Sequence, residues 1–449
     1  MPLRLRRIMY LSFIALFLVV APILALYSMG FRYHPGKHRI ERTGLLVVNG
    51  QPDDASVVVN GAIRARGLPA RIGGLGENEY VVRVERAGYR PWERRIFVRS
   101  GWTVFADEIS LFREAEPQLV MPGEIGTFVV SPRTPWAAFT RTTDGSTELW
   151  LLNQRTGSRT LALRLPLGKH EISNEQNWIL KWAPHDDLLL VETPGDVIIV
   201  NAEPVTTRSL ATLLPQPPTT VDWELGNTPS ASIIAVSEGR LFRYNNTTER
   251  MASLTVPPPM VPFTVVRGNL FSVVDNTIAA TSLDDRKVRA IATLPTNTRP
   301  TTFTDAYGGT LTAETNAPVR TLIIDIGNGT VQEIAGRRAD NSGRSDPTLW
   351  IVNNIELWFR TNDKPPQFLT RQMEPIISAQ WDTTTRTAII ATEREVSAIT
   401  PNGAAAADPP TTIARFDTIQ GMAPFADSRT IVIAGRRGNI AGLWELPLR

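Results

Sequence analysis

The stretch GTFVVSPRTPWAAFTR (126–141), with STELWLLNQRTGSRTLAL (146–163) after it, has the pattern that decides the fold. It contains short apolar runs separated by turn residues, and the first run ends in Ser131-Pro132. Short runs rich in Val, Phe, Trp and Thr, bounded by Pro, Gly, Asn or Ser, are typical of β-strands joined by tight turns. Residues 124–163 therefore predict one unit of four antiparallel strands.

Similar units recur at intervals of about 40 residues, which is the spacing of propeller blades. The second unit carries 178–184, 188–191 and 197–200, and later units begin near Val221, Pro262, Thr302, Leu349, Ile377 and Gly421. Four strands per unit at this period predict an all-β chain with a β-propeller over 117–449. The sixth segment, 349–370, is short, so the expected number of blades is seven or eight.

The last unit has only three strand candidates, at 421–424, 430–434 and 443–447. A short apolar stretch, Gln118–Met121, lies just before the first unit. A closed ring has no exposed sheet edge, whereas an open one does. We therefore predict that 118–121 pairs with the last unit and closes the ring.

Two turns resemble those of WD-like propellers, whose blades carry a turn of the W-S-P-D-G type. They are Ser131-Pro132 and Trp182-Ala183-Pro184. The resemblance extends over 117–449 and implies the propeller fold. It implies no reaction.

The segment IMYLSFIALFLVVAPILALY (8–27) carries no charge and one proline, Pro22. As a helix it would be about 30 Å long, which matches the hydrocarbon core of a bilayer. A cleaved signal peptide would have a shorter apolar region and a small-x-small site, and 24–30 offers no such site. We predict a transmembrane signal-anchor at about 8–27, within an N-terminal region 1–30; a cleaved signal peptide and a buried core helix remain alternatives.

The charges that flank the apolar segment hardly favour one orientation in the membrane over the other. Basic residues flank the segment on both sides, at Arg4, Arg6 and Arg7 before it and at Arg32, Lys37, Arg39 and Arg42 after it. The rule that cytoplasmic flanks are basic therefore gives almost a tie. The short tail before the first apolar segment favours a cytoplasmic N-terminus, with the bulk of the chain extracytoplasmic and the lipid bilayer as partner of the helix.

The composition excludes several classes of function. The chain of 449 residues has 47 basic and 44 acidic residues, which is no electrostatic footprint for nucleic acid. It contains no cysteine, so disulfides, thiolate nucleophiles and zinc–cysteine sites are excluded. The length predicts two to four domains.

A polar linker, 31–42, follows the apolar segment. His34 and His38 are four residues apart, a spacing that binds metal on a helix, but Pro35-Gly36 between them indicates a turn. We interpret the linker as a solvated tether.

Short alternating strands begin at Thr43. They are expected at 45–48, 55–59, 80–85, 95–98, 103–106 and 109–112, with a hairpin turn at Asn60-Gly61. The pattern predicts a β-sandwich over 43–113. Gly73–Gly76 is followed by two acidic residues and no helix, so it is interpreted as a loop between strands rather than a phosphate site.

This region resembles the PEGA domain, which is named for a Pro-Glu-Gly-Ala turn. The corresponding residues are Pro52-Asp53-Asp54-Ala55, followed by Asn60-Gly61, Pro69 and Gly88-Tyr89. The resemblance implies a small, surface-associated β-sandwich and no catalytic residues. Together with the apolar helix and the propeller it implies a bacterial membrane-anchored envelope protein.

We find no pattern of catalytic, cofactor-binding or metal-binding residues. His170 and His185, the histidines of the propeller region, have no G-x-S-x-G or H-E-x-x-H motif near them. Asp186-Asp187, Asp284-Asp285 and the sequons at Asn246 and Asn328 are interpreted as turns. The recurring tryptophans are interpreted as core between blades; they are Trp136, Trp150, Trp178, Trp182, Trp223, Trp350, Trp358, Trp381 and Trp444.

The expected function is that of a non-catalytic interaction or scaffold module. The propeller would present a face to a protein or a cell-surface polymer, and the small sandwich would act as a spacer. The alternative is an exported propeller enzyme acting on polysaccharide or peptide, because a fold alone does not decide function. Carboxylates, or a histidine with them, converging at one mouth of the central channel would favour the enzyme. An apolar mouth or one of mixed charge would favour binding.

Overall fold

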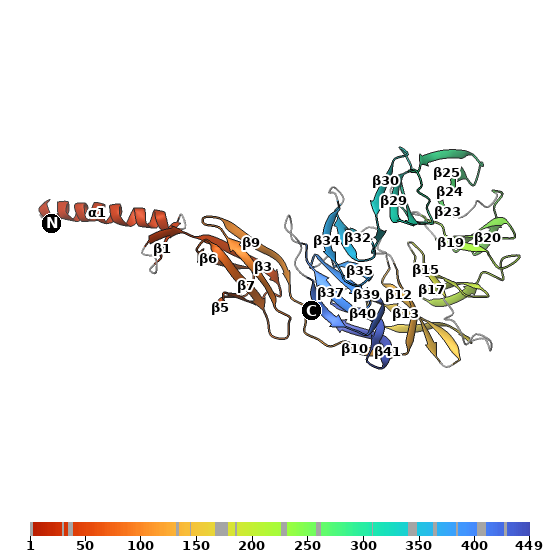
Figure 1. The fold of residues 1–449 in the computed structure, drawn as a ribbon, viewed down its shortest axis with the longest axis horizontal. Helices are drawn as coiled ribbons and strands as arrows, with labels where there is room; N and C mark the ends of the chain where they lie inside the picture. Colours follow the sequence, from red (N-terminus) through yellow and green to blue (C-terminus); the bar gives the residue numbers. More distant parts are fainter. Residues whose placement is uncertain are drawn as a thin grey trace. The chain divides into compact units, whose positions relative to one another are not determined.

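The structure is a computed structural model. It describes residues 3–28, 31–34, 39–131, 134–143, 145–166, 178–184, 186–225, 231–256, 262–307, 309–339, 348–361, 366–382, 385–401, 410–425 and 429–449. Apart from one N-terminal helix, the described elements are β-strands, as the sequence predicts (Figure 1). The chain divides into two compact units that meet between Ala115 and Glu116.

The N-terminal element is helix α1 (Leu3–Ser28), which contains Pro22. Its large apolar side chains between Met9 and Tyr27 are exposed along the helix. Among the residues described, no helix reaches both the length and the hydropathy of a membrane span. The assignment of 8–27 to a membrane therefore stays a prediction.

The expected linker contains a hairpin. Strand β1 (Phe31–His34) pairs antiparallel with β2 (Arg39–Arg42), and Phe31 lies opposite Arg42. The tip of the hairpin, which includes His38, lies outside the described residues.

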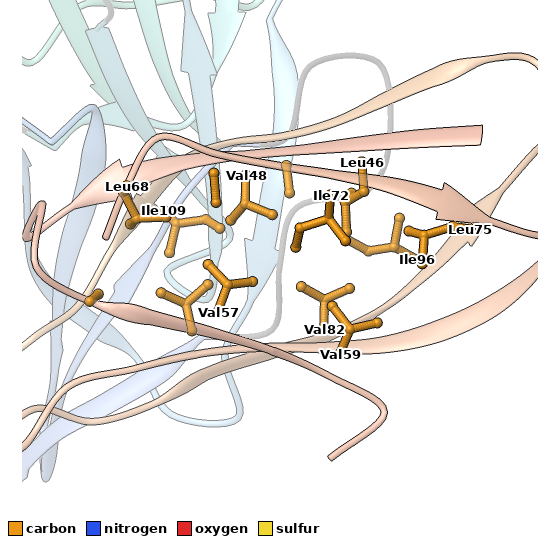
Figure 2. Packing of buried hydrophobic residues seen from close by; sticks show 14 of the residues in the cluster. Leu46, Val48, Val57, Val59, Leu68, Ile72, Leu75, Val82, Ile96 and Ile109 are labelled. Carbon is orange, nitrogen blue, oxygen red and sulfur yellow. The ribbon is translucent and has the colours of Figure 1, made fainter. Parts of the chain in front are cut away.

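The first unit also contains the expected sandwich of two sheets. One sheet has the order β6-β3-β9, with β3 (Gly44–Gln51), β6 (Ala70–Leu75) and β9 (Thr103–Ser110); the other has the order β5-β4-β7-β8, with β4 (Ser56–Val59), β5 (Ala62–Arg66), β7 (Asn78–Glu85) and β8 (Trp92–Val98). Side chains that alternate along the strands, such as Leu46, Val57 and Val82, meet between the sheets and form the core (Figure 2).

Local turn chemistry explains the correct prediction of a hairpin at Asn60-Gly61, whereas two other predictions for this unit differ from the structure. Asn60 and Gly61 have φ of 48° and 80°, as a two-residue hairpin requires. Gly73-Gly74, expected in a loop, belongs to β6, because Ile72 and Leu75 are buried and pairing with β3 continues through this stretch. The two strands expected over 103–112 form one strand, β9, with an irregular register near Glu108.

In the part of the chain that is described, the second unit contains eight four-stranded sheets, which are eight blades of a propeller. The first four blades along the chain are β11 (Glu124–Val130), β12 (Trp136–Thr143), β13 (Ser146–Asn153), β14 (Arg159–Pro166); β15 (Ile179–Trp182), β16 (Leu188–Glu192), β17 (Val197–Ala202), β18 (Val205–Ser209); β19 (Thr220–Trp223), β20 (Ser232–Ser237), β21 (Arg240–Asn245), β22 (Arg250–Ser253); and β23 (Phe263–Val266), β24 (Asn269–Val274), β25 (Thr277–Ser282), β26 (Val288–Thr293).

Four further blades complete the unit. They are β27 (Thr302–Tyr307), β28 (Thr310–Asn316), β29 (Val319–Asp325), β30 (Val331–Ala335); β31 (Arg337–Arg338), β32 (Thr348–Val352), β33 (Glu356–Arg360), β34 (Gln367–Arg371); β35 (Ile376–Asp382), β36 (Thr387–Thr392), β37 (Glu395–Ile399), β38 (Thr411–Arg415); and β39 (Thr418–Pro424), β40 (Thr430–Arg437), β41 (Ile440–Pro447) with β10 (Gln118–Pro122).

The expected ring closure is confirmed. Strand β10 pairs antiparallel with β41 and completes the blade made of β39, β40 and β41 (Figure 1). The first segment of the propeller unit thus supplies the outer strand of its last blade.

The sixth blade is not short, because its innermost strand precedes the segment expected to begin it. Arg337 and Arg338 form β31, and they pair with Ile351 and Trp350 of β32. A strand of two arginines has no apolar pattern, so the sequence gives no sign of it.

The core of the propeller lies between neighbouring blades, as expected from the tryptophans. Six of the nine are buried; they are Trp136, Trp178, Trp182, Trp223, Trp350 and Trp444. Two of them also join blades through the indole N–H: Trp182 donates to the Val129 carbonyl (3.3 Å) and Trp223 to the Lys181 carbonyl (2.8 Å). These contacts connect the inner strands β11, β15 and β19 in sequence.

Candidate binding channel of the propeller

Residues from several blades, most of them on inner strands, line a cavity of about 430 Å³. Its charged lining residues are Lys181, Asp222, Asp305, Glu314, Arg337 and Arg338, and Trp182, Trp223 and Phe303 add apolar wall. Three basic and three acidic side chains make its charge mixed rather than of one sign. These residues come from β15, β19, β27, β28 and β31.

One charged group centres on Lys181. Its Nζ lies 3.0 Å from Glu192 Oε1 and 3.9 Å from Asp222 Oδ2, and it donates to the Val221 carbonyl (3.2 Å). Burial raises the pKa of Asp222, and the nearby Glu192 adds to this; the ammonium of Lys181 and the Trp223 N–H oppose it. Asp222 thus holds its proton to higher pH than an ordinary aspartate.

A second group centres on Glu314, which is half-buried in β28. Burial raises its pKa, while the charge of Arg337 and a hydrogen bond from the Arg338 N–H lower it in part. The Arg337 guanidinium is itself fixed, because Nη2 donates to the Ile376 carbonyl of the next blade (3.1 Å). The arginine is therefore oriented before any ligand arrives.

A smaller cavity of about 210 Å³ shares Val129, Val130, Arg337 and Arg338 with the first. Its other walls include Ser378, Gln380 and Gln420, of which Gln380 Nε2 donates to the Met422 carbonyl (3.3 Å). The two arginines of β31 therefore stand between a charged cavity and one lined by amides and a hydroxyl.

The lining offers several kinds of polar group beside an apolar wall. Ammonium, guanidinium, carboxylate, amide and indole groups can together hold a polar or zwitterionic ligand through several directed contacts. In the part of the chain that is described, no group of His, Asp and Glu side chains is arranged to hold a metal ion.

The residues singled out from the sequence lie elsewhere. Asp284-Asp285 lies in a turn, as interpreted, and Asp285 Oδ1 accepts from the Lys287 N–H there (3.3 Å). Asp186-Asp187 lies in a bend, and Asp186 Oδ2 accepts from the N–H of the distant Ala231 (2.7 Å). Both sequons also lie in turns, closed by Asn245 Oδ1 and Asn328 Oδ1. His170 and His185 lie outside the described residues.

Sequence reasoning missed the charged residues of the channel, although a signal was present. Lys181-Trp182 and Asp222-Trp223 each place a charge directly before a tryptophan at the end of an inner strand. Because side chains alternate across a strand, the buried indole directs the preceding charge to the other face. In β15 and β19 that charge borders the channel.

A comparison with protein families identifies the small domain. Residues 43–108 match the PEGA domain. The PEGA-like sandwich expected from the turns at Pro52 and Asn60 is therefore confirmed, and it covers a minor part of the chain.

The similar solved structures are distant from this chain. A streptogramin B lyase is 14% identical with a TM-score of 0.41, over 62% of this chain and 94% of its own. Hsv2 of Kluyveromyces lactis is 10% identical with a TM-score of 0.36, over 57% and 88%. An uncharacterised protein of Listeria monocytogenes is 12% identical with a TM-score of 0.42, over 63% and 94%. No curated protein matches the sequence.

Proposed function

We propose that this chain is a membrane-anchored envelope protein whose propeller binds a protein partner at its central channel. The PEGA domain acts as a spacer between the bilayer and the propeller. The N-terminus is cytoplasmic, and the rest of the chain is extracytoplasmic. The observation that carries the proposal is the mixed charge of the channel, in which Lys181 and Arg337 are already held by neighbouring groups.

The anchor is supported by the apolar segment 8–27 and by the exposure of its side chains. Phe13, Phe17 and Leu24 are among the side chains of α1 exposed by more than half. A helix that is apolar on all sides needs lipid or protein around it, since water would leave this surface unfavourably exposed. Protease added to spheroplasts should digest epitopes beyond residue 43; protection until lysis would reverse the topology.

The binding role is tested by crosslinking from the channel. A photoreactive amino acid at Thr304, an exposed residue of the channel wall, should capture a discrete protein in intact cells. The same amino acid at Val288, 69% exposed on an outermost strand, is the matched control. Arg337→Glu should abolish capture from Thr304, because it reverses a charge that lines both cavities.

Equal capture from both positions, or capture that survives Arg337→Glu in a folded propeller, would contradict the binding role of the channel. Circular dichroism of the purified variant shows whether the propeller is folded. Lys287→Glu, on a residue whose side chain is 84% exposed, controls for reversal of a surface charge.

One observation favours the enzyme as a second candidate. Asp222 and Glu314 line one cavity, and both have raised pKa values, as expected of a carboxyl group that donates a proton in catalysis. On this alternative, envelope polysaccharides or peptides would be cleaved. Asp222→Asn and Glu314→Gln would each remove the activity, and unchanged cleavage by both variants would exclude it.

A further inference from the structure

Three aromatic side chains near one end of the PEGA domain are exposed. Trp102 is 67% exposed in the turn between β8 and β9, Phe97 is 52% exposed at the last position but one of β8, and Phe105 is 62% exposed near the start of β9. Phe97 lies between buried Ile96 and Val98, and Phe105 precedes buried Ala106, so the two phenylalanines face outward from different sheets of the sandwich. Trp102 lies in the turn between the two strands. An exposed indole suits a boundary between an apolar and an aqueous phase, because its ring is apolar while its N–H is a donor.

This turn is fastened to the chain that comes from α1. The Gly101 N–H donates to the Thr43 carbonyl (3.2 Å), and the Ser100 hydroxyl donates to the Arg42 carbonyl. The Leu45 N–H in turn donates to the carbonyl of Trp102 (3.0 Å). The aromatic turn therefore lies beside the point where the hairpin enters the domain.

The hairpin brings this point close to the end of α1. Arg42 lies opposite Phe31 in the β1–β2 pair. Phe31 follows Ser28, the last residue of α1, by at most about 10 Å of extended chain, and paired strands add about 5 Å. The connectivity alone therefore keeps the turn near the end of the helix.

The charges beside the turn suit the headgroup layer of a membrane. Arg42 and Arg99 are exposed, and the Arg42 side chain lies against Gly101 of the turn. The nearby Glu77 accepts from the Ser100 N–H (3.2 Å). Tryptophan and arginine are the residues that membrane proteins place at the boundary between lipid and water. The indole lies among the glycerol and carbonyl groups, while the guanidinium contacts phosphate.

We propose that the turn Arg99–Trp102 docks onto the lipid surface from which α1 emerges. This inference rests on the proposed membrane anchor and adds a second contact with the same bilayer. The docked turn limits the tilt of the PEGA domain, so the domain stands on the membrane as a fixed spacer rather than swinging on the hairpin.

The absence of cysteine from the sequence permits a direct test with single introduced cysteines. The full chain is reconstituted in vesicles of phosphatidylcholine and phosphatidylglycerol, with a nitroxide at one of three positions. Thr103→Cys reports on the turn, Ala87→Cys on the opposite end of the domain, and Leu16→Cys on α1. Collision with oxygen, which dissolves in lipid, and with a water-soluble nickel chelate gives the depth of each label.

Docking predicts several-fold less collision with nickel at 103 than at 87, and loss of that protection when Trp102→Ser is added. A label at 103 as accessible to nickel as the one at 87, while Leu16 is in lipid, would overturn docking and leave the anchor intact. A label at 16 that is open to nickel would overturn the anchor, and docking with it. If the label at 103 becomes immobilised only when envelope protein is added, the turn binds protein rather than lipid, which also overturns the proposal.

Discussion

Leu119 of β10 lies opposite Trp444 of β41, so the start and the end of the propeller unit are joined in one sheet. The same strand places Met121, 8% exposed, in a cluster with Phe139 of the first blade and Leu443 of the last. A strand that pairs with one blade and packs on the next holds the ring closed. Its loss should affect the whole propeller.

Met121→Ala should destabilise the propeller by about 2–5 kcal/mol, because it leaves a cavity between the first and last blades. Chemical denaturation followed by tryptophan fluorescence measures the change. Gln118→Ala, on an exposed residue of the same strand, should have little effect. A Met121→Ala variant as stable as the parent would contradict this account of closure.

Glu148→Gln should cost about 1–3 kcal/mol, since a buried charge partner is lost. The Glu148 carboxylate, 1% exposed, accepts from Trp150 Nε1 (2.9 Å) and from Arg141 Nε (3.0 Å), and it also contacts Arg164. Burial raises its pKa, but these donors outweigh burial and hold it below the ordinary value of 4.5. The stabilisation is therefore present above about pH 4.5 and is lost as the pH falls through the lower pKa of the folded state.

The difference in free energy of unfolding between the parent and Glu148→Gln should therefore become smaller in acid. Calorimetry between pH 3 and 7 measures it. Glu356 repeats the arrangement, with Trp358 two residues later and Arg371 on the adjacent strand, so Glu356→Gln should behave alike. Glu249→Gln, in an exposed pair with Arg208, serves as control and should change stability by less than about 1 kcal/mol. A gap that is independent of pH would contradict the role of the charge.

Asp222→Asn and Glu314→Gln should have the opposite dependence on pH. Because the folded chain raises the pKa of both carboxyl groups, their favourable contribution is complete below the ordinary values of 3.8 and 4.5 and is lost as the pH rises through the raised values. At pH 7 both variants should melt at or above the temperature of the parent, with the difference vanishing in acid. A lower melting temperature at pH 7 would show that the charged forms stabilise the channel.

Leu46→Ala should destabilise the PEGA domain alone, by about 2–5 kcal/mol. Leu46 is fully buried in the core between the two sheets, and this core belongs to the first of the two compact units. Calorimetry should resolve two unfolding transitions: that of the PEGA domain, which shifts to a lower temperature in the variant, and that of the propeller, which does not shift. Val81→Ala, on the outer face of β7, is the matched control, and a joint shift of both transitions would contradict separate folding.

The sequence predicted well what neighbouring residues decide. Three features were predicted correctly: the alternation in 80–85, the positive φ at Asn60-Gly61 and the recurring apolar units. All three depend on local sterics and on burial of one strand face. The closing strand could also be predicted, because a last unit with three strand candidates needs a fourth. The prediction failed at Gly73-Gly74 and Arg337–Arg338, where strands form without apolar alternation because neighbouring strands pair with them.

The candidate site depended on the tertiary structure. Lys181, Asp222, Glu314 and Arg337 come from four blades, and no spacing along the chain relates them. They meet because closure of the ring brings the blades around one axis. The pKa values of Asp222 and Glu314 are raised because both carboxyl groups are partly shielded from water. The sequence by itself thus determined most of the strands, the repeating blade unit and the closing segment. The number of blades and the grouping of charges in the channel were decided by the tertiary structure, because both depend on how strands from distant parts of the chain pair and pack around the ring.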